Sequence, residues 1–230
     1  AFVDHIRPWL KGNGAGTVLS LQVENEYSYS TADNMRYIDW AAELCNNASR
    51  GEALCTMCNN TGSPTLPDYR NTIFTCNADC NTRLKGGAAD ETWIDGHKRA
   101  YPNQPSLYSE IEVADPGWPD LPTPPGVSSA SDLSYEATRF VADGGMGTNY
   151  WMWFGGTNFR GASNMPTTFM WSAPLGSFGL PNQPMFDHIG KMHRLFVQFE
   201  ATLAGQPVPN REWLAFDHVC YRRSYKPVAG

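Results

Sequence analysis

Two apolar segments of this chain run directly into carboxylates. The stretch Leu21-Gln22-Val23-Glu24-Asn25-Glu26-Tyr27 brings two carboxylates and an amide within three residues, and the segment 105–110 ends on Glu110. Two carboxyl groups that face each other across a cleft are the working parts of a glycoside hydrolase, in which one protonates the leaving oxygen and the other attacks the anomeric carbon. Acidic residues in an ordinary solvated turn are the alternative interpretation of the first stretch.

A metal site is the other chemistry that two carboxylates allow. Such a site needs further ligands, and no His or further Asp lies beside either strand end. The five histidines are scattered along the chain, and we interpret them as surface or core residues: His5, His97, His188, His193 and His218. We therefore expect no metal and no cofactor.

Alternating strands and helices must position these carboxylates. The apolar, β-branched runs predict five strands, at residues 17–23, 53–57, 71–76, 105–110 and 147–154. The helical patterns lie at residues 1–11, 33–46, 129–142 and 183–203, with a looser helix that ends near residue 101. This alternation predicts an α/β fold with parallel strands, and both an open sheet and an incomplete barrel satisfy it. Ligands of such folds bind at the carboxyl ends of the strands.

Composition narrows the class of protein. The chain has 230 residues, which predicts one domain over residues 1–230, and its formal net charge of −6 without any basic run argues against nucleic acid. The high aromatic content of 13%, with 8 Trp, suits a sugar-binding cleft and equally a Trp-rich core. No stretch is long enough to span a membrane. The chain begins in what looks like the middle of a helix, so we expect further sequence before Ala1.

The cysteines suggest either a zinc ribbon or disulfides. Five of the six lie within 36 positions, and they are Cys45, Cys55, Cys58, Cys76 and Cys80, followed much later by Cys220. Two glycosylation sequons, at Asn47 and Asn59, fall in the same region. Together these features favour disulfides in a secreted, cell-wall, lysosomal or vacuolar protein. We expect at least one disulfide among Cys55, Cys58, Cys76 and Cys80, without a derived pairing.

Four segments resemble the glycoside hydrolase family 35 β-galactosidases, in family order over nearly the whole chain. The segment Leu21–Tyr27 resembles the most specific motif of that family, and Ser109-Glu110 resembles its nucleophile segment. The segment 151–159, Trp-Met-Trp-Phe-Gly-Gly-Thr-Asn-Phe, and the segment 173–175, Ala-Pro-Leu, are similar to its later motifs. The cysteine pattern is similar to that of plant-type members.

The resemblance implies a (β/α)8 barrel and a retaining reaction that removes terminal β-D-galactose from oligo- or polysaccharides. It makes Glu26 the expected general acid/base, Glu110 the expected nucleophile and Asn25 a sugar-binding residue. The carboxyl groups of Glu26 and Glu110 should then lie about 5–5.5 Å apart. The five predicted strands become barrel strands 4 to 8, and strands 1 to 3 are expected from upstream sequence.

The sugar-binding residues depart from the family pattern. Glu112 stands where an aromatic residue is usual, and Trp151 stands where Tyr is usual. The segment 168–175 carries Trp171 for a Tyr and lacks both Asp of the family. Trp keeps a face for stacking and loses a hydroxyl group. Two alternatives therefore remain: a non-catalytic carbohydrate-binding relative, and an inactive fragment of a larger glycosidase.

Overall fold

A computed structural model gives the fold of the chain in two compact units. Unit 1 comprises Ala1–Lys85 and Glu91–Leu107, and unit 2 comprises Gly86–Asp90 and Tyr108–Gly230. The structure describes residues 2–10, 16–27, 31–58, 67, 69, 71–77, 93–113, 129–159, 168–170, 173–210, 212–214 and 221–227. A single domain over all 230 residues stays a prediction.

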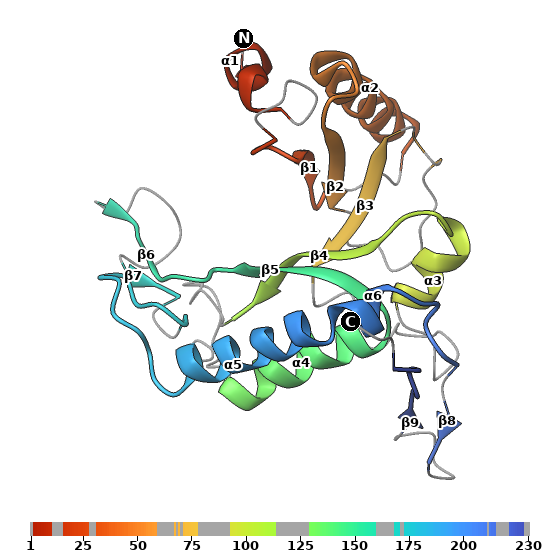
Figure 1. Cartoon of the computed structure of the whole chain (residues 1–230). Helices are drawn as coiled ribbons and strands as arrows, with labels where there is room; N and C mark the ends of the chain where they lie inside the picture. The colour runs from red at the N-terminus through yellow and green to blue at the C-terminus, as the bar shows by residue number, and fades with distance from the viewer. Residues whose placement is uncertain are drawn as a thin grey trace. The chain divides into compact units, whose positions relative to one another are not determined.

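Three parallel strands form the sheet of unit 1. They are β1 (Ser20–Asn25), β2 (Leu54–Cys58) and β3 (Thr72–Asn77), side by side in that order (Figure 1). The helices of this unit are α1 (Phe2–Ile6), a 3-10 turn η1 (Arg7–Trp9), α2 (Ala32–Ser49) and α3 (Trp93–Ala100). All three strands lie within a few residues of the predicted positions.

Helix α2 covers this sheet with the face that its sequence period predicts. Thr31 caps the helix by accepting a hydrogen bond from the Asn34 backbone N–H. The side chains of Ile38, Ala41 and Ala42 are buried in one core cluster together with Met57, Phe74 and Tyr101. This packing confirms the predicted amphipathic helix.

The apolar, β-branched run 17–23 is of the kind that is buried in a parallel sheet, but β1 is only partly buried. Its residues are exposed or half-buried, whereas every residue of β3 is buried. β1 stands at the end of the strand order, and Leu19 just before it is 60% exposed. The physical reason is that apolar sequence indicates a strand without telling how many neighbours will cover it.

Two strands and two long helices build most of unit 2. Strand β4 (Ser106–Glu112), which enters this unit at Tyr108, neighbours β5 (Gly145–Trp151), and helices α4 (Ala130–Ala142) and α5 (Met185–Gln198) lie beside each other (Figure 1). A short helix, α6 (Glu200–Ala204), follows α5. Unit 2 also has two small antiparallel sheets. One pairs β6 (Gly156–Thr157) with β7 (Thr168–Phe169), and the other pairs β8 (Glu212–Trp213) with β9 (Tyr221–Arg222).

The apolar period of the predicted helix 183–203 puts Phe186, Ile189, Met192, Leu195 and Phe196 on its inner face, and the structure corrects this prediction. Ile189 and Met192 are buried as predicted, but Leu195 is 54% exposed and Met185 is buried in its place. Phe186 and Phe196, also predicted inside, are half-buried. The buried stripe is therefore centred on the first half of α5.

The disulfides of the described residues include one that joins α2 to β2. Cys45 and Cys55 are bonded with their Cα atoms 6.1 Å apart, so Cys55 pairs outside the predicted group of four. Cys58 is buried and not disulfide-bonded, whereas Cys76 is disulfide-bonded. Cys80 and Cys220 lie outside the described residues, and a disulfide within the group of four stays a prediction.

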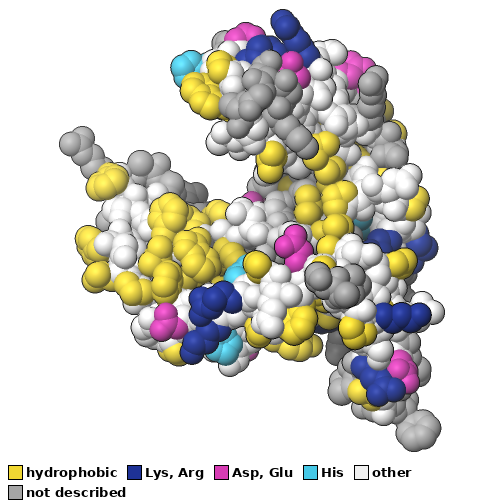
Figure 2. Space-filling model, in the orientation of Figure 1, with side chains coloured by type: hydrophobic (Ala, Val, Ile, Leu, Met, Phe, Trp, Pro, Cys, Tyr) yellow, Lys and Arg dark blue, Asp and Glu magenta, His cyan; other side chains and the backbone are white. Residues whose placement is uncertain are grey.

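Several large apolar side chains of unit 2 face solvent. Figure 2 shows hydrophobic side chains gathered over the part of unit 2 that holds β6, β7 and the start of α5. Phe178 is 92% exposed, and Phe154 and Leu180 are exposed as well. Among the helices that the structure describes, none is both long and apolar enough to cross a membrane.

Candidate active site at the ends of the strands

Glu26 lies immediately after β1, at the carboxyl end of the strand. Its side chain is exposed, and its backbone adopts a left-handed conformation with φ of 57°. The backbone N–H of Glu26 donates to the carbonyl oxygen of Cys58 over 3.3 Å, and its carboxylate accepts a hydrogen bond from the side-chain amide of Asn77. The residue is therefore held to the ends of β2 and β3 while its carboxylate faces solvent.

The neighbouring carboxylate, Glu24, has a different environment. One of its oxygens accepts from the hydroxyl of Tyr37 and the other from the backbone N–H of Asn25, over 2.9 Å. The hydrogen bond to Glu24 raises the pKa of Tyr37, and burial of the tyrosine raises it further by a smaller amount. Glu24 thus links β1 to α2, and Glu26 is the more exposed of the two carboxylates.

Asn25, the predicted sugar-binding amide, is the last residue of β1 and is exposed. Its Oδ1 accepts a hydrogen bond of 3.1 Å from the side chain of Gln22. Oδ1 is thus engaged within the strand, and a role of Asn25 in sugar binding stays a prediction.

Glu110 and Glu112 both belong to β4. The strand was predicted to end at Glu110, but it continues to Glu112, so Glu110 lies inside it. Glu110 is half-buried and Glu112 is exposed. Residues two apart in a strand point to the same face, so the two carboxylates share one face of β4.

Trp151 is the last residue of β5 and is half-buried. Its carbonyl oxygen accepts from the backbone N–H of Val113 over 3.2 Å, which places it beside the end of β4. Trp171, the other predicted aromatic platform, lies outside the described residues. Glu26 belongs to unit 1 and Glu110 to unit 2, so the predicted separation of their carboxyl groups stays a prediction.

Sequence reasoning missed two residues at the Glu26 end of unit 1, Asn77 and Cys58. Asn77 ends the fully buried strand β3, and its side chain is only 1% exposed. A polar residue that closes an otherwise buried strand was the available signal, because a buried amide requires hydrogen-bond partners. The sequence predicts Cys58 only as a zinc ligand or as half of a disulfide.

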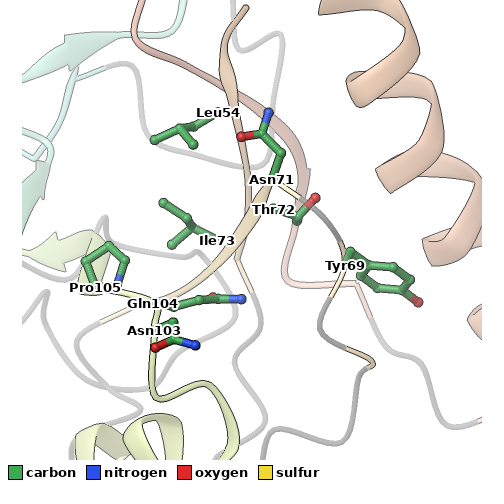
Figure 3. A pocket seen from close by; sticks show the side chains of 8 residues that line it. All are labelled: Leu54, Tyr69, Asn71, Thr72, Ile73, Asn103, Gln104 and Pro105. Carbon is green, nitrogen blue, oxygen red and sulfur yellow. The ribbon is translucent and has the colours of Figure 1, made fainter. Parts of the chain in front are cut away.

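A pocket of about 460 Å³ lies at the opposite ends of the same strands (Figure 3). It is lined by residues at the starts of β2, β3 and β4: Leu54, Tyr69, Asn71, Thr72, Ile73, Asn103, Gln104 and Pro105. Asn71 donates to the carbonyl oxygen of Ala53, and Gln104 accepts from the backbone N–H of Phe74. These two amides thus hydrogen-bond to backbone groups of neighbouring segments of unit 1. The pocket does not contain the candidate catalytic residues.

The histidines of the described residues all belong to helices. His97 is fully buried, and burial lowers its pKa to about 4. His193 accepts or donates a hydrogen bond of 2.7 Å with the hydroxyl of Tyr150, and burial lowers its pKa while raising that of Tyr150 to about 12. His5 and His188 are exposed. His218 lies outside the described ranges.

The described part of the chain also holds no group of three or more His, Cys, Asp or Glu side chains arranged as metal ligands.

Comparison with protein families gives a match over most of the chain. The model described as "Glycosyl hydrolases family 35" matches residues 1–196. Among curated proteins, the chain is 31% identical over 222 residues to "Probable beta-galactosidase 2" of Dictyostelium discoideum, covering 90% of this chain and 26% of that protein. It is 30% identical over 200 residues to "Beta-galactosidase 13" of Arabidopsis thaliana, covering 84% of this chain and 21% of that protein. The chain thus spans about a quarter of the length of these relatives.

Solved structures show the fold. A β-glucuronidase from Ruminococcus gnavus in complex with D-glucaro 1,5-lactone matches with a TM-score of 0.53 and 13% identity, over 83% of this chain and 35% of that chain. The same enzyme without ligand gives a TM-score of 0.53 and 14% identity. Together with the alternation of parallel strands and helices, this likeness confirms the predicted α/β fold of a partial (β/α)8 barrel.

Proposed function

Because this chain belongs to glycosyl hydrolases family 35, we propose that it carries the two catalytic carboxylates of a retaining β-galactosidase. The observation that carries the proposal is the setting of Glu26. It is an exposed carboxylate at the carboxyl end of a parallel strand, held by a buried amide. Active sites of (β/α)8 barrels are built at this end of the strands.

The proposed reaction has two steps at the anomeric carbon. In the first, the ionised carboxylate of Glu110 attacks that carbon, the bond to the leaving oxygen breaks, and the protonated carboxyl of Glu26 gives its proton to that oxygen. In the second, Glu26 takes a proton from water, and the water oxygen displaces Glu110 from the sugar. Two inversions leave the configuration at the anomeric carbon unchanged.

The remaining predicted residues bind the sugar in this proposal. Asn25 donates to a sugar hydroxyl, and the ring faces of Trp151 and Trp171 stack on the C–H face of galactose. Glu112, on the same face of β4 as Glu110, accepts from another hydroxyl. The mechanism uses protein groups alone.

The proposed substrate is a glycan with terminal β-D-galactose, since both curated relatives named above carry the name beta-galactosidase. The Cys45–Cys55 disulfide supports an oxidising location, that is, a secreted, cell-wall, lysosomal or vacuolar protein. Because the chain spans about a quarter of its relatives' length, we propose that further barrel strands from sequence outside it complete the pocket.

The test uses this chain and a chimera in which it replaces the matching part of the Dictyostelium relative. Glu110→Gln should abolish turnover of an activated aryl β-galactoside. Glu26→Gln should lower kcat/KM by about 10²–10⁴-fold for a substrate with a poor leaving group, because such a leaving group needs the proton. The same variant should spare the first step with an activated aryl leaving group, and azide should rescue its slow second step.

Glu43→Gln is the matched control, since Glu43 is an exposed glutamate on α2. It should leave all rates unchanged. Turnover that survives in Glu110→Gln, or azide rescue of Glu110→Gln in place of Glu26→Gln, would reverse the assigned roles. Galactose binding without turnover in the parent protein would support the non-catalytic alternative.

A further inference from the structure

A hydrogen-bonded run of three side chains leads from the interior of unit 1 to the carboxylate of Glu26. The side-chain amide of Asn77 donates to Oε1 of Glu26. The Sγ of Cys58 lies 3.2 Å from Oδ1 of Asn77 and donates to it. Cys58 and Asn77 are 2% and 1% exposed, so the inner part of the run is sealed from solvent.

The thiol of Cys58 determines which way the amide of Asn77 points. An amide has a donor end and an acceptor end of nearly the same shape, and it can be turned by 180° without changing the space it fills. A thiol that donates to Oδ1 favours the orientation in which Nδ2 faces Glu26. The reversed amide would bring its oxygen against the carboxylate and leave both groups short of a donor.

The orientation of Asn77 has a consequence for the acid form of Glu26. An amide N–H can only donate, and the carbonyl oxygen of a carboxylic acid accepts better than its hydroxyl oxygen, so Oε1, which accepts from Asn77, is favoured as the unprotonated oxygen. The proton of the acid form is then carried by Oε2. Both the rotation of the carboxyl group and the oxygen that holds its proton are thereby determined before a substrate binds.

We propose that Asn77 is a positioning residue for the acid/base Glu26, and that the Cys58 thiol acts through Asn77 by orienting its amide. This inference rests on the proposed function of Glu26. Neither Asn77 nor Cys58 needs to touch the sugar. Their contribution is the presentation of one defined oxygen of Glu26 to the leaving group.

A leaving-group comparison in the chain and the chimera separates this role from a purely structural one. A poor leaving group needs the proton of Glu26, whereas a dinitrophenolate departs without it. Asn77→Ala should therefore reduce kcat/KM for an alkyl β-galactoside about 10–100-fold more than for the dinitrophenyl galactoside, the size of loss expected from a misplaced catalytic group. Cys58→Ala should show the same bias, and Cys58→Ser, which keeps a donor, should restore the parent ratio.

Asn71→Ala is the matched control, since Asn71 also supplies a side-chain amide that bonds a neighbouring strand, but at the opposite end of β3. Asn71→Ala should change kcat/KM equally for the two substrates. An equal loss for both substrates in Asn77→Ala would overturn the proposal for Asn77. If Cys58→Ala keeps the parent's ratio of kcat/KM for the two substrates, the proposed role of the thiol is overturned.

A second measurement needs no turnover. In the ¹⁵N-labelled chain, the Asn77 side-chain amide should exchange with solvent more slowly than exposed Asn amides, and Glu26→Gln or Cys58→Ala should shift its resonances. Fast solvent exchange of the Asn77 side-chain amide, or resonances that stay unchanged in both variants, would contradict the geometry. If Glu26→Gln itself shows no leaving-group bias while the amide signals respond as expected, the proposed function fails and the hydrogen-bonded run stands.

Discussion

At position 26 the backbone takes up a left-handed conformation, φ 57°, that costs a side-chain-bearing residue about 1–2 kcal/mol. Glycine would adopt it without that cost. The position nevertheless carries a glutamate, whose carboxylate is exposed and bonded to a buried amide. Strain of this kind persists where the surrounding structure determines it and often accompanies function. The backbone conformation would favour glycine at position 26, so the carboxylate explains why a glutamate stands there.

His97 gives a prediction for the pH dependence of stability. It is buried against Trp93, with ring centroids 4.6 Å apart, and burial lowers its pKa to about 4. An unfolded histidine titrates near 6.5. Between these values the unfolded chain binds more protons, so this contribution is present above pH 6.5 and is lost as the pH falls toward 4. It amounts to about 3 kcal/mol at most.

His97→Phe should therefore remove part of the fall in the free energy of unfolding between pH 7 and pH 4, measured by urea unfolding at several pH values. His188→Phe, a substitution at an exposed histidine of α5, serves as the control and should leave the pH dependence as it is in the parent. Identical pH dependence in His97→Phe and the parent would show that His97 is not buried in its neutral form.

Strand β1 contains a bulge that changes which way the side chains of its last residues point. Gln22 pairs with Thr56 and Glu24 pairs with Met57, so Val23 is an extra residue in β1. Such a bulge shifts the alternation of side chains. Val23 and Glu24 are consecutive and both half-buried, and Asn25 and Glu26 are both exposed. Apolar alternation in the sequence could not reveal the bulge, because the register depends on the neighbouring strand.

The disulfide between α2 and β2 should stabilise unit 1. Cys45 and Cys55 are separated by 10 positions, and closing a loop of that length removes conformational freedom from the unfolded chain worth about 2–3 kcal/mol. The double variant Cys45→Ala, Cys55→Ala should lose that amount in the free energy of unfolding, measured by urea titration. A loss below about 0.5 kcal/mol would mean that the bond adds no constraint to the unfolded chain.

Over the chain as a whole, the sequence predicted the main strands and helices, because most of them have an apolar run or a clear helical period. It did not predict β6–β7 or β8–β9, whose strands have two residues each. In the second pair, Arg222 holds Glu212 through hydrogen bonds of 2.7 and 2.8 Å, a contact across the loop that no periodicity encodes.

The candidate site was predictable to a similar extent. The motif around Glu26 was recognised from consecutive residues. Its partner Asn77 is 51 positions away in the sequence, and the contact depends on the register of β1, β2 and β3. The sequence shows an Asn directly after the predicted strand 71–76, but it shows neither the burial of that residue nor its partner.

Under the proposed function, Glu110 is the nucleophile of a retaining glycosidase and forms a covalent bond to the sugar. The most direct measurement is mass spectrometry of peptides after the chimera reacts with a 2-deoxy-2-fluoro-β-galactoside that has a dinitrophenyl leaving group. The fluorine slows both steps by destabilising the oxocarbenium-like transition state, and the good leaving group restores the first, so the glycosyl-enzyme accumulates. We predict one covalently bound fluorogalactose, on Glu110, and none in Glu110→Gln. A label on Glu26, Glu112 or another residue, or inactivation that survives in Glu110→Gln, would contradict the claim.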